Sequence, residues 1–189
     1  MDDILKDTDY KSIQNEVKEI GENEVYFLPY LMGERSPIND TDARGTFIGM
    51  TADTSRVDML QAVLEGVAFA IRDSFEVAKS LGINIERSNI CGGGAKSELW
   101  KKIMANVLGI PLDTVKTEQG PGYGGAILAM VGCDEYDSVA AACSELIEIS
   151  DTVYPDEELT QKYEGKYKKF SLIYPALKNL FADLRKEEK

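Results

Sequence analysis

A glycine-rich segment at residues 91–97, CGGGAKS, is the part of this sequence best suited to binding an anion. It follows β-prone residues and precedes a segment with helical spacing, so it predicts a strand, a tight turn and the start of a helix. Backbone N–H groups at a helix start lack intrahelical acceptors, and the helix dipole is positive there, which favours a phosphate. The alternative is a tight connection that binds no ligand. The segment is not a Walker A loop, because Ala95 precedes Lys96 and the four-residue glycine spacing is missing.

A second glycine-rich segment, GPGYGG at residues 120–125, matches the GxGxxG pattern. That pattern binds dinucleotides when it follows a buried, apolar strand. Residues 112–118, LDTVKTE, are too polar to form such a strand. We therefore expect a turn with close helix packing at 120–125 rather than an NAD site.

The net charge and the lack of histidine exclude several kinds of binding partner and of catalytic chemistry. Acidic residues number 33 and basic residues 21, which gives a net charge of −12 and opposes binding to nucleic acids and to anionic membranes. The sequence contains no histidine, which excludes Ser-His-Asp and Cys-His nucleophiles and HExxH zinc sites. Any catalysis must use carboxylates, lysine, tyrosine or backbone dipoles.

Further features indicate a cytoplasmic protein with one folded domain. The cysteines Cys91, Cys133 and Cys143 have no CxxC spacing, so we expect neither a disulfide framework nor a metal site. The N-terminus carries acids where a signal peptide carries bases. The longest uncharged run, residues 119–133, is shorter than the roughly 20 residues that cross a bilayer. A chain of 189 residues suits one well-buried α/β domain.

Strand-like and helix-like segments alternate along the chain, which is typical of α/β layers. The longest expected helix has capping residues at Ser55 and Gly82. The expected helices cover residues 1–20, 55–81, 100–107, 126–131, 138–146 and 157–186, and the expected strands cover residues 25–31, 46–50, 89–91 and 112–116.

Two spaced segments resemble a known family. Residues 45–50 (GTFIGM), followed after seven residues by 58–65 (DMLQAVLE), are similar at every constrained position to the second signature of the FGGY carbohydrate kinases. Residues 27–37 (FLPYLMGERSP) and 92–100 (GGGAKSELW) are similar to the xylulokinase branch of that family. The resemblance extends from about residue 24 to the C-terminal helices.

This resemblance implies a fold and a division of the chain. The implied fold is α/β and ribonuclease H-like, of the actin/hexokinase ATPase type, and it is a partial C-terminal domain with C-terminal helices. We expect an N-terminal helical segment at residues 1–22 and the nucleotide-binding domain at residues 23–189. The family's N-terminal domain, sugar-binding residues and catalytic aspartate map before Met1, so the resemblance implies no catalytic residue and no metal ligand in this chain.

The resemblance also implies an activity. A complete member transfers the γ-phosphate of MgATP to a ketose, here D-xylulose, giving D-xylulose 5-phosphate, and the sugar binds through the missing N-terminal domain. The implied nucleotide-binding residues are Gly92, Gly93, Gly94, Ala95 and Glu98: the glycine pair Gly93 and Gly94 lies near the α-phosphate, and Glu98 lies on the adenosine side. ATP and Mg²⁺ are the implied cofactors, and the isolated chain is expected to be inactive.

Other functions remain open at the level of the sequence. One is a kinase for gluconate, ribulose or glycerol, because such enzymes share the domain. Another is a catalytically dead module that acts in assembly or interaction, with a purely structural glycine turn. Because missing strands would leave apolar surface and a sheet edge exposed, we also expect self-association into a homo-oligomer.

Overall fold

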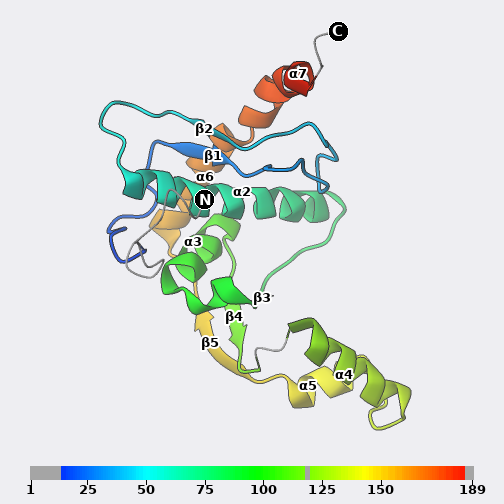
Figure 1. Ribbon diagram of the computed structural model, residues 1–189. Helices are drawn as coiled ribbons and strands as arrows, with labels where there is room; N and C mark the ends of the chain where they lie inside the picture. Colours follow the sequence, from blue (N-terminus) through cyan, green and yellow to red (C-terminus); the bar gives the residue numbers. More distant parts are fainter. Residues whose placement is uncertain (1–13, 118–119, 186–189) are drawn as a thin grey trace, which may run out of the picture.

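The computed structural model describes residues 14–117 and 120–185 (Figure 1). Helices and strands alternate along most of this length. In chain order, the elements are β1 (Tyr26–Leu28), β2 (Thr46–Ile48), α2 (Arg56–Ser80), β3 (Ser88–Ile90), the 3₁₀ turn η1 (Gly93–Lys96), α3 (Glu98–Leu108), β4 (Leu112–Val115), α4 (Gly120–Gly132), α5 (Val139–Leu146), β5 (Ile149–Val153), α6 (Glu157–Phe170) and α7 (Ile173–Arg185).

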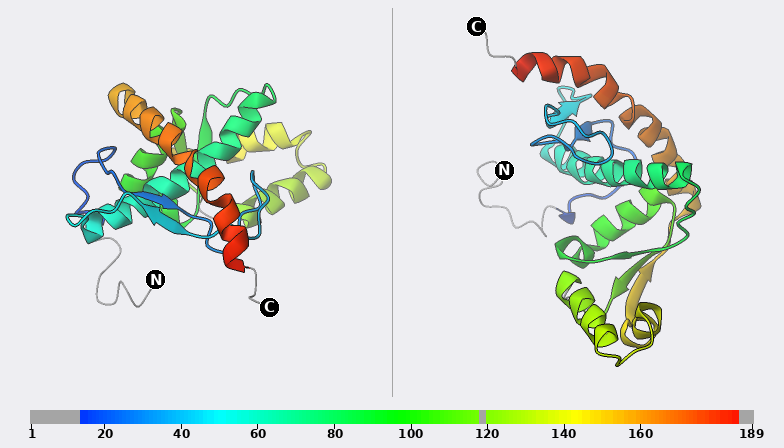
Figure 2. Two further views of the ribbon diagram at one scale, coloured as in Figure 1. Left: turned by 90° about the horizontal axis from the view of Figure 1, so that it is seen from above. Right: turned by 90° about the vertical axis from the view of Figure 1, so that its right-hand side faces the viewer.

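The strands form two small sheets. β1 and β2 pair antiparallel on either side of the loop that connects them. β3 and β4 pair parallel, with Asn89 opposite Asp113, and β5 adds to the other edge of β4 in the antiparallel direction. Figure 2 shows α4 and α5 at one end of the molecule, set apart from α2, α3 and α6. The mixed sheet with its helices confirms the expected α/β class.

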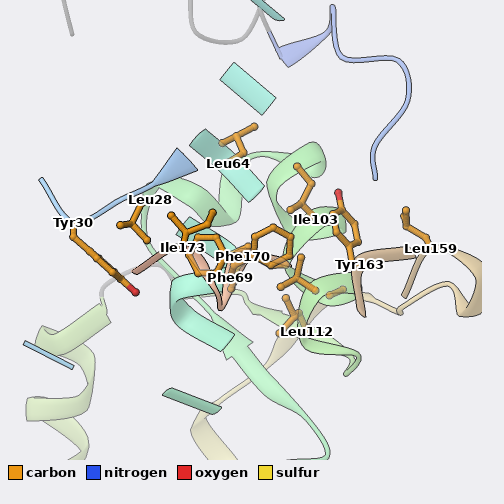
Figure 3. Packing of buried hydrophobic residues seen from close by; sticks show 14 of the residues in the cluster. Leu28, Tyr30, Leu64, Phe69, Ile103, Leu112, Leu159, Tyr163, Phe170 and Ile173 are labelled. Atoms are coloured by element: carbon orange, nitrogen blue, oxygen red, sulfur yellow. The ribbon is translucent and has the colours of Figure 1, made fainter. Parts of the chain in front are cut away.

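The core lies between α2, α3, α6 and the two sheets. Figure 3 shows Phe69 of α2 next to Phe170 of α6, with Ile103 and Leu112 in the same cluster. The ring centroids of Phe69 and Phe170 are 5.2 Å apart. At Gly66, an added Cβ would lie 2.0 Å from the carbonyl oxygen of Phe27, so glycine allows α2 to cross β1 at close range.

The capping residues of α2 follow the sequence prediction. Ser55 and Asp58 form a reciprocal capping box at its start. Gly82, with φ +81°, donates its amide to the carbonyl of Lys79 at the end of the helix. Gly109 ends α3 in the same left-handed conformation. The capping residues therefore mark the ends of α2 and α3 close to where the sequence predicts them.

Two expectations about local structure need correction or qualification, and one strand was not expected. Residues 120–125 form the first turns of α4 and not a turn before a helix. An added Cβ at Gly122, Gly124 or Gly125 would meet no atom within 4 Å. These glycines therefore do not allow close packing against any of the described residues. β5 was not predicted, because its mixed polar and β-branched sequence, ISDTV, forms a largely exposed edge. Of the expected helix at 1–20, residues 1–13 lie outside the described residues, and residues 17–20 are not helical.

No helix in the described part of the chain is both long enough and apolar enough to span a membrane.

Candidate functional site

The glycine segment forms the turn between β3 and α3, as predicted. Gly92 has φ +79°, a conformation that favours glycine. The amide of Ala95 donates to the carbonyl of Gly92 (3.2 Å), and the amide of Ser97 donates to the carbonyl of Gly94 (3.0 Å). These bonds make a 3₁₀ turn, so α3 begins only at Glu98. The amides of Ala95 and Ser97 are engaged within the turn and are not the donors that a ligand would use.

The three glycines of the turn have three different surroundings. Gly92 is required by its backbone conformation. An added Cβ at Gly94 would lie 2.7 Å from Nε1 of Trp100, so the indole ring closes that side of the turn. At Gly93 an added Cβ would meet no atom within 4 Å, and its φ lies outside the left-handed region. Nothing in the described residues therefore explains why position 93 lacks a side chain.

Ser97 connects the glycine turn to the N-terminal part of the chain through hydrogen bonds. Its Oγ accepts a hydrogen bond from the amide of Trp100 (3.0 Å), which caps α3. The same hydroxyl donates to Oε1 of Gln14 (2.5 Å). Residues far apart in the sequence thus meet at the start of α3, a contact that the sequence analysis did not predict.

Glu98 projects from the first turn of α3 and is held by a buried lysine. The Glu98 side chain is 80% exposed, whereas that of Lys101 is 4% exposed. Nζ of Lys101 lies 2.8 Å from Oε1 of Glu98 and 2.9 Å from Oδ2 of Asp151 on β5. Burial lowers the pKa of Lys101, but its hydrogen bonds to the two carboxylates outweigh this effect and raise the pKa overall. The hydrogen bond from Lys101 lowers the pKa of Asp151.

Lys101 and Asp151 are site residues that sequence reasoning missed. The i, i+3 spacing of Glu98 and Lys101 was a readable signal, since residues at that spacing share a helix face. The participation of Asp151 was not readable, because it lies on the unpredicted strand β5.

A second buried cluster holds the central helix in place. The carboxylate of Glu65 on α2 accepts hydrogen bonds from Gln61 (2.9 Å) and from the Tyr163 hydroxyl (3.1 Å). Its other oxygen lies 2.7 Å from Nζ of Lys166, and both charged side chains are at least nine-tenths buried. Burial, together with the nearby Glu65 charge, raises the pKa of Tyr163. The cluster joins α2 to α6 and does not contribute an atom to the glycine turn.

The second glycine segment lies beside the first. The two segments follow β3 and β4, which pair parallel. Both segments therefore lie at the end of the sheet where the C-termini of these strands meet. A cavity of about 400 Å³ is lined by Cys91, the first residue of the first segment, and by Gly120 and Gly124 of the second. Among the described residues, no group of three or more acidic or cysteine side chains is arranged to hold a metal ion.

This chain shares the ribonuclease H-like fold, of the actin/hexokinase ATPase type, with crystal structures of sugar kinases. The chain matches the crystal structure of a xyloylose kinase from Brucella ovis with a TM-score of 0.81 and 35% identity, covering 90% of this chain and 35% of that one. It matches the crystal structure of gluconate kinase from Lactobacillus acidophilus with a TM-score of 0.82 and 25% identity, covering 92% of this chain and 35% of that one.

The chain belongs to the FGGY family of carbohydrate kinases: the model of the family's C-terminal domain matches residues 4–133. Among curated relatives, the xylulose kinase of Staphylococcus xylosus is 37% identical over 156 residues, which are 82% of this chain and 32% of the relative. The present chain thus spans about a third of the length of the curated relatives that it matches. The family resemblance read from the sequence is confirmed.

Proposed function

We propose that this chain is the nucleotide-binding part of a sugar kinase that transfers the γ-phosphate of MgATP to a ketose, D-xylulose, to give D-xylulose 5-phosphate. The relatives named xylulose kinase support this assignment. Phosphoryl transfer suits a chain without histidine, because it depends on positioned phosphates, Mg²⁺ and a carboxylate base.

The observation that carries the proposal is the open backbone at Gly93. A glycine that is needed neither by its own φ nor by a neighbouring side chain leaves room for a ligand to approach the main chain closely. The position fits an anion, because it precedes the N-terminus of α3, an eleven-residue helix whose dipole is positive at that end.

We assign the phosphates of the nucleotide to the amides of Gly93 and Gly94, at the turn formed by residues 92–95. Glu98, which is exposed and held by Lys101, faces the adenosine side. Mg²⁺ bound together with the phosphates would neutralise charge on the group that is transferred. The residues of this chain bind and orient the nucleotide; we assign none of them to proton transfer.

The acceptor sugar and the catalytic base belong, in this proposal, to the part of a complete kinase that has no counterpart in these 189 residues. The small-molecule sugar is thus a partner of the complete enzyme. A gluconate kinase is also among the matched structures, so gluconate is the second candidate substrate. A non-catalytic interaction module is the remaining alternative, and it predicts no nucleotide binding.

Calorimetric titration of the chain with MgATP tests the proposal. We expect a saturable signal that weakens about tenfold or more in Gly93→Val, because the side chain fills the space taken by the phosphate. Gly165→Val on α6 is the matched control, since an added Cβ there also meets no atom within 4 Å. No binding by the unaltered chain, or equal weakening in the two variants, would contradict the proposal.

A further inference from the structure

The sole tryptophan of the sequence, Trp100, presents the nitrogen-bearing edge of its indole ring to the glycine turn. A Cβ added at Gly94 would lie 2.7 Å from Nε1 and 2.8 Å from Cδ1 of the indole, but 3.6 Å from Cε2. The edge of the ring that carries the N–H therefore lies against the main chain of Gly94.

The indole ring is held in this place by its backbone and by its packing. The amide of Trp100 donates to Oγ of Ser97 (3.0 Å), the residue that caps α3. The side chain is partly buried and packs against the hydrophobic cluster that contains Ile103. Because both parts are anchored, Nε1 lies next to the turn before any ligand binds, and a donor that is already positioned loses little entropy when it binds a ligand.

The indole N–H is an unused donor. An indole nitrogen can donate a hydrogen bond but cannot accept one, and within residues 14–117 and 120–185 no acceptor bonds to Nε1 of Trp100. In the same part of the chain, the amides of Gly93 and Gly94 are likewise without an acceptor, whereas those of Ala95 and Ser97 bond within the turn. These two amides and the indole N–H are therefore neighbouring donors that a ligand can use.

We propose that Trp100 is a further nucleotide-binding residue, whose indole N–H donates a hydrogen bond to a phosphate oxygen of MgATP. This inference rests on the nucleotide site proposed above, to which it adds a side-chain donor beside the amides of Gly93 and Gly94. Phosphate is the expected acceptor because Nε1 borders Gly94, whereas Glu98 is assigned to the adenosine side. A phosphate oxygen is charged, and hydrogen bonds to charged acceptors are stronger than those between neutral groups.

The unaltered chain gives the first test, because a sole tryptophan gives one indole N–H signal in a proton–nitrogen correlation NMR spectrum. The chain is titrated with MgATP and, separately, with magnesium tripolyphosphate, which carries the phosphates without adenosine. We expect the indole signal to shift saturably with both, at the same midpoint as the amides of Gly93 and Gly94. Shifts of these amides with an unmoved indole signal, or an indole shift with MgATP alone, would overturn the role of Trp100. No saturable shift in the turn would overturn the nucleotide site itself.

Calorimetric titration of Trp100→Phe gives the second test, because phenylalanine keeps an aromatic ring and removes the N–H. We expect MgATP and magnesium tripolyphosphate to bind about tenfold more weakly to this variant. Tyr174→Phe is the matched control: it also removes one ring donor, the hydroxyl that bonds Asp40 (2.7 Å), and it lies on α7, away from α3 (Figure 1). We expect its affinities to stay within about twofold of the unaltered chain.

Unchanged affinities in Trp100→Phe, or equal losses in the two variants, would overturn the proposal. Circular dichroism shows whether Trp100→Phe is folded. If it is not, the indole signal of the unaltered chain decides, because that measurement needs no substitution.

Discussion

The indole of Trp100 lies directly against Gly94, where an added Cβ would come within 2.7 Å of Nε1 and 2.8 Å of Cδ1. The neighbouring Gly93 has open space at the corresponding position. Two adjacent glycines therefore have different roles: one accommodates the packing of the chain itself, and the other leaves the backbone open.

This difference predicts that two alanine substitutions have unequal effects on stability. Gly94→Ala should lower the free energy of unfolding by about 1–3 kcal/mol, because the indole must move. Gly93→Ala should change it by less than about 0.5 kcal/mol, since the added methyl meets nothing. Urea unfolding followed by tryptophan fluorescence measures both. Equal stabilities of the two variants would contradict the packing described for Trp100.

Breaking the ion pairs of the two lysines that are buried in the described part of the chain, Lys166 and Lys101, should cost different amounts of unfolding free energy. Glu65→Gln leaves the ammonium of Lys166 buried without its carboxylate, which should cost about 3–5 kcal/mol of unfolding free energy. Lys101→Met leaves only Asp151 and Glu98, which are largely exposed and can be solvated, so we expect about 1 kcal/mol. Thermal or urea unfolding of both variants gives the comparison. A larger cost for Lys101→Met than for Glu65→Gln would show that burial does not decide the effect.

Asp113 predicts a dependence of stability on pH. Burial pushes its pKa upward, but hydrogen bonds from Thr152 and Arg87 outweigh burial and hold the pKa below its usual value. A carboxyl group whose pKa is lower in the folded state than in the unfolded state stabilises the fold at pH values above its unfolded-state pKa. This contribution is lost as the pH falls through the folded-state pKa. Stability should therefore decline below about pH 4, and Asp113→Asn should flatten the decline. Urea midpoints measured from pH 7 downward test this; an unchanged slope in Asp113→Asn would refute the assignment.

The isolated chain should not phosphorylate a sugar. Phosphoryl transfer requires the acceptor hydroxyl, its base and the γ-phosphate to be held in line, and we assign only the nucleotide end to this chain. A coupled assay for ADP release with MgATP and D-xylulose should give the rate of a blank without enzyme. A xylulose-dependent rate above that blank would show that these 189 residues hold a complete active site.

Local signals predicted most of the elements, and longer-range contacts account for what was missed. Ser55 and Gly82 marked the ends of α2 because capping depends on nearby residues. β5 was missed because its strand conformation depends on pairing with β4, a contact between distant residues. Glycines within residues 120–125 suggested a turn, yet α4 begins there. Glycine lowers helix propensity without forbidding a helix.

In the candidate site, too, local sequence predicted some features, and contacts between distant residues were missed. The turn at 92–95 could be read from glycines between a strand and a helix. The contacts of Ser97 with Gln14 and of Lys101 with Asp151 could not, because they join segments whose proximity only the fold creates.

We propose that the nucleotide binds at the turn formed by residues 92–95 and beside Glu98. Amide NMR spectra of the chain titrated with MgATP test it most directly, because each backbone N–H reports on its own surroundings. We expect saturable shifts concentrated at Gly93, Gly94 and Glu98, and their loss in Gly93→Val. Saturable shifts centred on another part of the chain, with these three amides unmoved, would contradict it.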